Sequence, residues 1–145
     1  MKGLAWWLRV VGALYVLEGG GLTLMALFAP DQFAATWAST AVGALDEVAV
    51  RGTLMAGLPG VLTWLLLGVL MLGFSRKPAR AGLLVMIVAA WELFVWVPVD
   101  LMGVFNGFAD GRAAALIAIH LVIGVSGLLL LRRGNSTGVA EAAYS

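Results

Sequence analysis

Three ionisable residues lie deep within long apolar stretches of the sequence, where an ionised side chain is costly to bury. Glu18, Glu92 and His120 each stand eight to ten residues from the polar end of such a stretch. Along a helix this spacing corresponds to a depth of roughly 12–15 Å. Ionisable groups inside membrane spans usually face a protein interior or a cavity. Two carboxyl groups and an imidazole at a common depth can share protons, as acid/base catalysis requires.

Further acidic and aromatic residues surround Glu92 in the sequence. Trp96 and Asp100 follow at intervals of four residues, and residues four apart share a helix face. Tryptophan normally gathers at membrane interfaces, where Trp6 and Trp7 are expected, but Trp64, Trp91 and Trp96 lie inside apolar stretches. Beside a carboxyl group, such indole rings favour a binding site for a bulky lipophilic molecule. The alternative is that they only pack the helices together.

Arg51 and Tyr15 extend this candidate site. Arg51 lies roughly 7–8 Å inside its apolar stretch, and its long side chain can reach further in. We expect it to hold an anionic group or to tune Glu92. Tyr15 stands one helical turn before Glu18, and residues 19–21 are all glycine, which allows a second backbone or a ligand to come close.

The candidate site therefore has two sets of residues. The groups expected to transfer protons are Glu92, Glu18, His120 and Asp100. The groups expected to hold a substrate are Arg51, Tyr15, Trp91, Trp96 and Trp64. We expect no metal and no other cofactor, since a single histidine excludes bis-histidine haem ligation within one chain and no metal-binding spacing motif is present. The alternative is a buried polar network that only pins the helices.

The composition places these residues in a membrane protein. Hydrophobic residues make up 62% of the 145 residues and charged residues 12%, about half the charged share of a soluble domain. The mean hydropathy is +1.01. These values exclude a disordered chain and a basic nucleic-acid binder. The absence of cysteine excludes thiolate catalysis and disulfide stapling.

Four stretches are long enough to cross the hydrocarbon core, which needs roughly 20 apolar residues. They are residues 4–28, 46–74, 79–100 and 112–131. We predict an all-α fold, an integral membrane antiparallel four-helix bundle with a polar chamber in its outer half. Residues 1–134 would form a single four-span domain and 135–145 a flexible cytoplasmic tail.

Local signals refine the spans. Segment 31–40 predicts a short interfacial helix between the first two spans, capped by Asp31 and with Phe33 and Trp37 on one face; an ordered loop is the alternative. Pro59 and Pro98 each remove a backbone donor inside a span, and we expect a kink at Pro59.

The basic residues predict the orientation of the spans. Seven Lys and Arg residues flank one side, in the N-terminus, the second connection and the tail, whereas only Arg51 and Arg112 lie on the other. Because basic residues favour the cytoplasmic side, we predict an integral cell-membrane protein with both termini in the cytoplasm. The long first stretch, interrupted by Glu18, favours a retained span over a cleaved signal peptide.

The layout resembles small bacterial four-helix membrane proteins of the DoxX-like and related uncharacterised-domain kind. The resemblance rests on Glu47-Val48-Ala49-Val50-Arg51-Gly52 at the start of the second span, a Gly-rich first span and a basic second connection. It implies a shared topology and little about activity. A fainter similarity, to sterol-isomerase-type membrane proteins with acids and tryptophans around an intramembrane pocket, carries over no residues.

We therefore expect a membrane-embedded enzyme that uses acid/base chemistry to isomerise, cyclise or open a lipophilic small molecule. A proton-coupled small carrier and a non-catalytic scaffold or subunit are the alternatives. The expected partners are the lipid bilayer and a lipophilic small molecule, without nucleic acid. Whether the chain forms homo-oligomers is left open.

Overall fold

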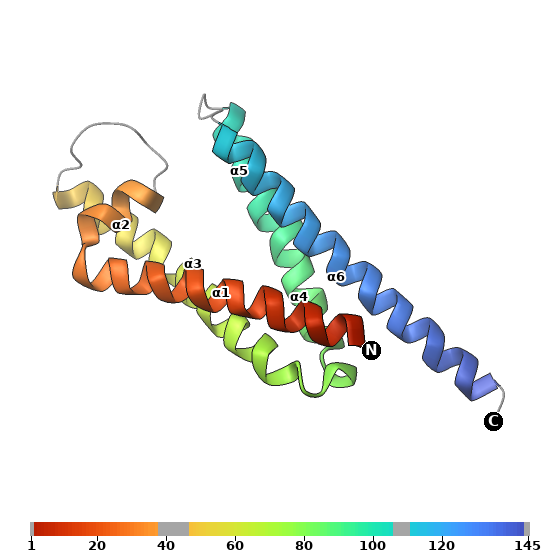
Figure 1. Ribbon diagram of the computed structural model, residues 1–145. Coiled ribbons are helices and arrows are strands. Elements are labelled where there is room, and N and C mark those ends of the chain that lie inside the picture. The colour runs from red at the N-terminus through yellow and green to blue at the C-terminus, as the bar shows by residue number, and fades with distance from the viewer. Residues whose placement is uncertain (1, 38–46, 106–110, 144–145) are drawn as a thin grey trace. The chain divides into compact units, whose positions relative to one another are not determined.

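A computed structural model describes residues 2–37, 47–105 and 111–143 of the chain. This part is almost entirely helical and contains no strand, so the predicted all-α class is confirmed. In chain order the elements are α1 (Lys2–Phe28), α2 (Pro30–Trp37), α3 (Glu47–Phe74), η1 (Pro78–Arg80), α4 (Gly82–Trp91), η2 (Glu92–Trp96), α5 (Val97–Phe105) and α6 (Gly111–Ala143) (Figure 1).

Four helical segments are long and apolar enough to cross a membrane, as predicted. They are Lys2–Phe28, Val50–Phe74, Gly82–Met102 and Ala114–Gly134. The third segment is continuous through α4, η2 and α5. The fourth belongs to α6, which continues to Ala143, through residues for which the sequence predicts a tail. The flexibility of that tail stays a prediction.

The contacts divide the chain into two units, which are described separately. Unit 1 consists of Met1–Val11 and Met71–Ser145, and so contains the start of α1 and everything from the end of α3 onward. Unit 2 is Gly12–Leu70, with the rest of α1, α2 and most of α3. The single-domain assignment of residues 1–134 stays a prediction.

Two glycines allow α1 and α3 to pack backbone against backbone in unit 2. A methyl group added to Gly19 of α1 would lie 2.7 Å from the Leu65 backbone nitrogen. One added to Gly68 of α3 would lie 2.8 Å from the Val16 backbone nitrogen and 2.9 Å from the Gly12 carbonyl oxygen. Small residues at helix contacts allow this close approach in membrane proteins. The predicted close contact at the glycine run is therefore made by Gly19.

The short helix predicted between the first two spans is present as α2. It begins at Pro30, one residue before the predicted cap, so that Asp31 lies in the first turn, where the helix dipole favours an acid. Phe33 is fully buried, and its N–H donates to the Ala29 carbonyl at 3.0 Å. The Trp37 side chain lies outside the described residues, and the interfacial position of α2 stays a prediction.

Hydroxyl side chains in the unit 2 helices bond to their own backbone. Thr23 donates to the Gly19 carbonyl at 2.6 Å, and Thr63 donates to the Pro59 carbonyl at 2.8 Å. Both bonds reach back four residues, the usual way for a helical hydroxyl to be satisfied. Helix α3 continues through Pro59; the expected kink there stays a prediction.

Many large apolar side chains lie on the outside of the described helices, while a few polar ones are buried. Exposed examples are Leu17, Met55, Leu83 and Val122, one from each long helical segment. The buried polar or charged residues of the described part are Ser75, Glu92 and His120. Because soluble proteins rarely bury charged residues or expose large apolar patches, this distribution suits contact with lipid.

The glycine contacts of unit 2 can be tested by alanine substitution. Gly19→Ala and Gly68→Ala should each lower the free energy of unfolding in detergent by about 1–3 kcal/mol, because the added methyl group meets backbone that cannot swing aside. Gly21→Ala, where nothing lies within 4 Å of the added carbon, is the matched control and should leave stability unchanged or slightly raised. Equal effects of the three substitutions would contradict the close α1–α3 packing.

Candidate functional site

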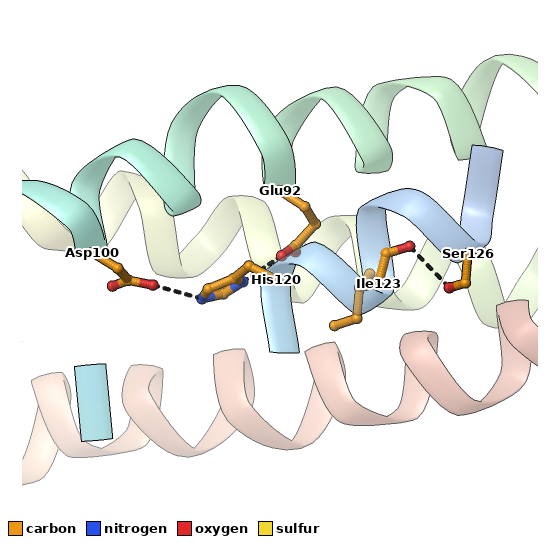
Figure 2. Close-up of polar contacts among 5 residues, drawn as sticks. All are labelled: Glu92, Asp100, His120, Ile123 and Ser126. Atoms are coloured by element: carbon orange, nitrogen blue, oxygen red, sulfur yellow. Dashed lines mark hydrogen bonds and ion pairs between the residues drawn. The ribbon is translucent and has the colours of Figure 1, made fainter. Parts of the chain in front are cut away.

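The polar cluster of unit 1 lies between two helical segments that run side by side. The continuous segment formed by α4, η2 and α5 packs along α6, and all three of its parts contact that helix (Figure 1). Glu92 and Asp100 project from the first segment and His120 from α6 (Figure 2).

The first segment changes its hydrogen-bond pattern at Glu92. Residues Glu92–Trp96 form a π-helical turn, in which the Val97 N–H donates to the Glu92 carbonyl, five residues back. Pro98 lies two residues after the last residue of this turn. Its lack of an N–H and the clash of its ring with the carbonyl four residues earlier both disfavour a regular α-helix here. Such π turns are rare and are often found at functional sites.

The π turn aligns the two acids of the segment. In a regular α-helix, residues eight apart point about 80° away from each other. A π turn accommodates one additional residue, so the eight-residue spacing acts like seven and the difference falls to about 20°. Glu92 and Asp100 therefore both face α6 (Figure 2).

His120 lies between these two acids. Its Nδ1 hydrogen bonds with Glu92 Oε2, and its Nε2 lies 3.4 Å from Asp100 Oδ2. Glu92 is completely buried, while the side chains of His120 and Asp100 are 10% and 14% exposed. An imidazole nitrogen facing a carboxylate oxygen donates its N–H. The protonation state that serves both carboxylates is therefore the imidazolium, with a proton on each ring nitrogen.

Aromatic rings cover the imidazole. The Trp96 ring is stacked on His120, with centroids 6.0 Å apart and an interplanar angle of 19°. Trp91 meets Trp96 edge to face at 6.4 Å. An indole face attracts a cation within about 6 Å of its centroid, so Trp96 supports a positive charge on His120.

Small residues of α6 bring its neighbours close to the cluster. A methyl group on Gly124, one turn after His120, would lie 2.6 Å from Leu93 Cγ of the π turn. One on Gly127 would lie 2.8 Å from the Trp7 ring, whose Nε1 donates to Ser126 Oγ at 2.9 Å. Trp7 is thus buried against α6, and its predicted place at the membrane interface stays a prediction. The need of its ring nitrogen for an acceptor was the signal for this contact in the sequence.

Three buried polar atoms in or near the cluster, Glu92 Oε1, Asp100 Oδ2 and the indole nitrogen Nε1 of Trp91, have no hydrogen-bond partner in the described part of the chain. Asp100 Oδ2 still has its ion-pair contact with His120, which leaves Glu92 Oε1 and Trp91 Nε1. Most buried polar atoms in proteins are hydrogen bonded, so an orphaned pair beside an acid/base cluster requires an explanation.

The structure brings together five of the predicted site residues. These are Glu92, Asp100, His120, Trp91 and Trp96, all in unit 1. The remaining four, Glu18, Arg51, Tyr15 and Trp64, belong to unit 2. There the Tyr15 and Trp64 rings lie 6.2 Å apart and are buried, whereas Glu18 and Arg51 are exposed. Participation of these four residues in the site stays a prediction.

The described residues contain no group of three or more His, Cys, Asp or Glu side chains that could hold a metal ion. The geometry of the cluster explains this. Glu92 and Asp100 contact opposite ring nitrogens of His120, so the three side chains do not converge on one point.

Comparison of the chain with family models, curated proteins and solved structures gave no match. The resemblance to DoxX-like membrane proteins stays a prediction.

Deletion of single residues tests the role of the π turn. Removing Phe94, whose side chain is exposed, should convert the turn to regular α-helix and leave Glu92 and Asp100 facing His120. Removing Met86 from the regular helix α4, also exposed, should rotate the preceding residues about 100° relative to the cluster. We expect the Phe94 deletion to elute as one species in mild detergent with a small loss in thermal stability, and the Met86 deletion to aggregate. Equal tolerance of both deletions would contradict the aligning role of the turn.

Proposed function

We propose that this chain is an integral membrane protein, an antiparallel four-helix bundle with both termini in the cytoplasm, whose buried Glu92–His120–Asp100 cluster performs acid/base chemistry on a lipophilic small molecule. Four apolar helices and an apolar exterior support membrane insertion. The excess of Lys and Arg on one side of the spans supports the orientation, which puts the cluster in the outer half of the bundle.

The contact of His120 with a different carboxyl group at each ring nitrogen is the observation that carries this proposal. An imidazole can take up a proton at one nitrogen and release one from the other without turning its ring. Asp100 is the more exposed acid and Glu92 the fully buried one. Protons can therefore pass from Asp100 through His120 to Glu92, whose role would be that of the catalytic acid or base.

Glu92 offers a free atom for the reaction. Its Oε2 is engaged by His120, whereas Oε1 is buried without a hydrogen-bond partner among the described residues. Two carboxylates and one neutral imidazole become neutral overall when they hold two further protons, and neutrality favours burial in apolar surroundings. In that state one proton converts His120 to the imidazolium and the other is available at Glu92 Oε1 for a substrate.

Isomerisation, cyclisation and ring opening of a lipophilic substrate all suit this arrangement. Each can begin with protonation of the substrate by Glu92 Oε1 and end with the return of a proton to the same atom. His120 would donate or accept at Oε2 to balance the charge of Glu92, and Trp91 and Trp96 would shape the apolar surroundings and stabilise positive charge on the substrate.

A proton-coupled carrier is the second candidate, because the same acid–imidazole–acid sequence resembles part of a proton path. Other hydroxyl groups of the spans do not visibly extend it. Thr63, Ser75 and Ser126 donate to carbonyls of their own helices. The enzyme is therefore the function that the geometry supports better.

Substitution of Glu92 tests the enzyme directly. The lipophile that co-purifies in mild detergent is identified by mass spectrometry and its conversion is followed in lipid nanodiscs. Glu92→Gln should keep the fold, because the amide has the size of the acid and its oxygen can still accept a hydrogen bond from His120 Nδ1. It should lower turnover about 10²–10⁴-fold, the usual contribution of general acid–base catalysis. Glu141→Gln, outside the apolar spans, is the control with unchanged turnover. Full turnover by Glu92→Gln would refute the assignment. If the wild type shows no turnover and Glu92→Gln folds normally, the result would favour a scaffold.

Reconstitution separates the carrier from the enzyme. Proteoliposomes with an imposed pH gradient should show no proton flux above that of empty liposomes when the co-purified lipophile is added. Flux that depends on the gradient, and that Asp100→Asn abolishes, would establish the carrier instead.

A further inference from the structure

The polar end of the substrate can be inferred from the two orphaned atoms at the start of the π turn. Glu92 Oε1 and Trp91 Nε1 are buried, and neither has a hydrogen-bond partner within the described residues. The indole nitrogen can only donate, whereas the carboxyl oxygen accepts when ionised and donates when protonated. Leaving such an atom unsatisfied is unfavourable, so a bound molecule that hydrogen bonds to either atom would be stabilised.

Ring contacts place Trp91 beside the cluster. The Trp96 ring lies 6.0 Å from the His120 ring, and the Trp91 ring lies 6.4 Å from that of Trp96. Trp91 also directly precedes Glu92 in the chain. The orphaned donor and the orphaned oxygen thus come from adjacent residues of the segment that carries the cluster, next to two indole rings.

Charge and hydrogen-bond capacity narrow the chemistry of the ligand. An anionic group would meet two carboxyl groups balanced by a single imidazole, so like-charge repulsion opposes it. A quaternary ammonium group could balance Glu92 but has no lone pair for the Trp91 N–H. A neutral oxygen atom can accept a hydrogen bond from the Trp91 N–H. A hydroxyl group can also bond to Glu92 Oε1 whether Glu92 is ionised or protonated. A carbonyl group can bond to Glu92 Oε1 only when Glu92 is protonated.

We propose that the site binds a lipophilic molecule whose polar end is a neutral oxygen function, a carbonyl or a hydroxyl group. This oxygen accepts a hydrogen bond from Trp91 Nε1 and bonds to Glu92 Oε1, while the apolar body lies against the indole rings. The inference rests on the proposed function, because Glu92 Oε1 is the same atom that exchanges a proton with the substrate.

A series of probes with matched alkyl chains tests this inference in lipid nanodiscs. The probes are methyl decyl ketone, dodecanol, dodecane and dodecyltrimethylammonium. Two NMR signals of the full chain are followed during titration: the indole N–H of Trp91, assigned by its absence in Trp91→Phe, and the labelled side-chain carboxyl carbon of Glu92, assigned by its absence in Glu92→Gln.

We expect the ketone or the alcohol to shift both signals saturably, and dodecane to shift neither. Which of the two acts at the lower concentration distinguishes a carbonyl from a hydroxyl ligand. Trp91→Phe should weaken the binding seen at Glu92 about tenfold, since it removes one buried hydrogen bond and keeps an aromatic ring. Trp6→Phe, at an exposed tryptophan, is the matched control and should bind as the wild type does.

The outcomes separate this inference from the proposed function. If the ammonium probe shifts the Glu92 signal and neither oxygen probe does, a lipophilic ligand reaches the acid but the neutral-oxygen class is wrong. If no probe moves the Glu92 signal beyond the effect of dodecane, the inference is overturned together with the accessibility to lipophiles that the proposed function needs.

Discussion

The placement of one imidazole between two carboxyl groups is the constraint on which unit 1 depends. An isolated charge in apolar surroundings is strongly unfavourable. Removing one partner of a buried ion pair therefore destabilises a protein more than replacing both partners by apolar residues. Glu92, completely buried, is therefore tied to His120, and His120 in turn to Asp100. The two acids must therefore face His120 from positions eight residues apart on the adjacent helical segment.

Local features of both helices serve this placement. The π turn before Pro98 turns Asp100 onto the face of Glu92, and Gly124 gives Leu93 of that turn room against α6. Trp96 covers the imidazole ring. Further along α6, toward its C-terminus, Trp7 from the start of α1 packs against Gly127 and donates a hydrogen bond to Ser126. The Trp7 indole and the Ser126 hydroxyl are thus satisfied locally, whereas Glu92 Oε1 and Trp91 Nε1 have no partner among the described residues. This contrast is why we place the chemistry there.

Much of the helical framework follows from the sequence, because the length of an apolar stretch depends only on residue type. The four long helical segments and the short helix α2 are examples. The positions of Glu92 and His120 along their helices could likewise be counted from the ends of the apolar stretches. Depth says nothing about rotation around the helix axis, however. Glu18 has a similar predicted depth, yet its side chain is exposed and belongs to the other unit.

The π turn and the position of Trp7 show why the remaining features escape prediction. Pro98 predicts a freed carbonyl, but the sequence around it does not reveal the π turn or the packing of Leu93 against Gly124 of α6. The contact of Trp7 with Ser126, 119 residues further on, likewise could not be found from the sequence around Trp7. Both depend on contacts between segments far apart in the chain.

Nitrogen NMR of the single histidine measures the central contact directly, because ¹⁵N-histidine labelling reports on His120 alone. In lipid nanodiscs at neutral pH, both ring nitrogens should carry a proton and show hydrogen-bonded shifts. Glu92→Gln should move mainly the Nδ1 signal and Asp100→Asn mainly the Nε2 signal. A neutral imidazole whose two signals are insensitive to both substitutions would contradict the acid–imidazole–acid cluster and the function proposed from it.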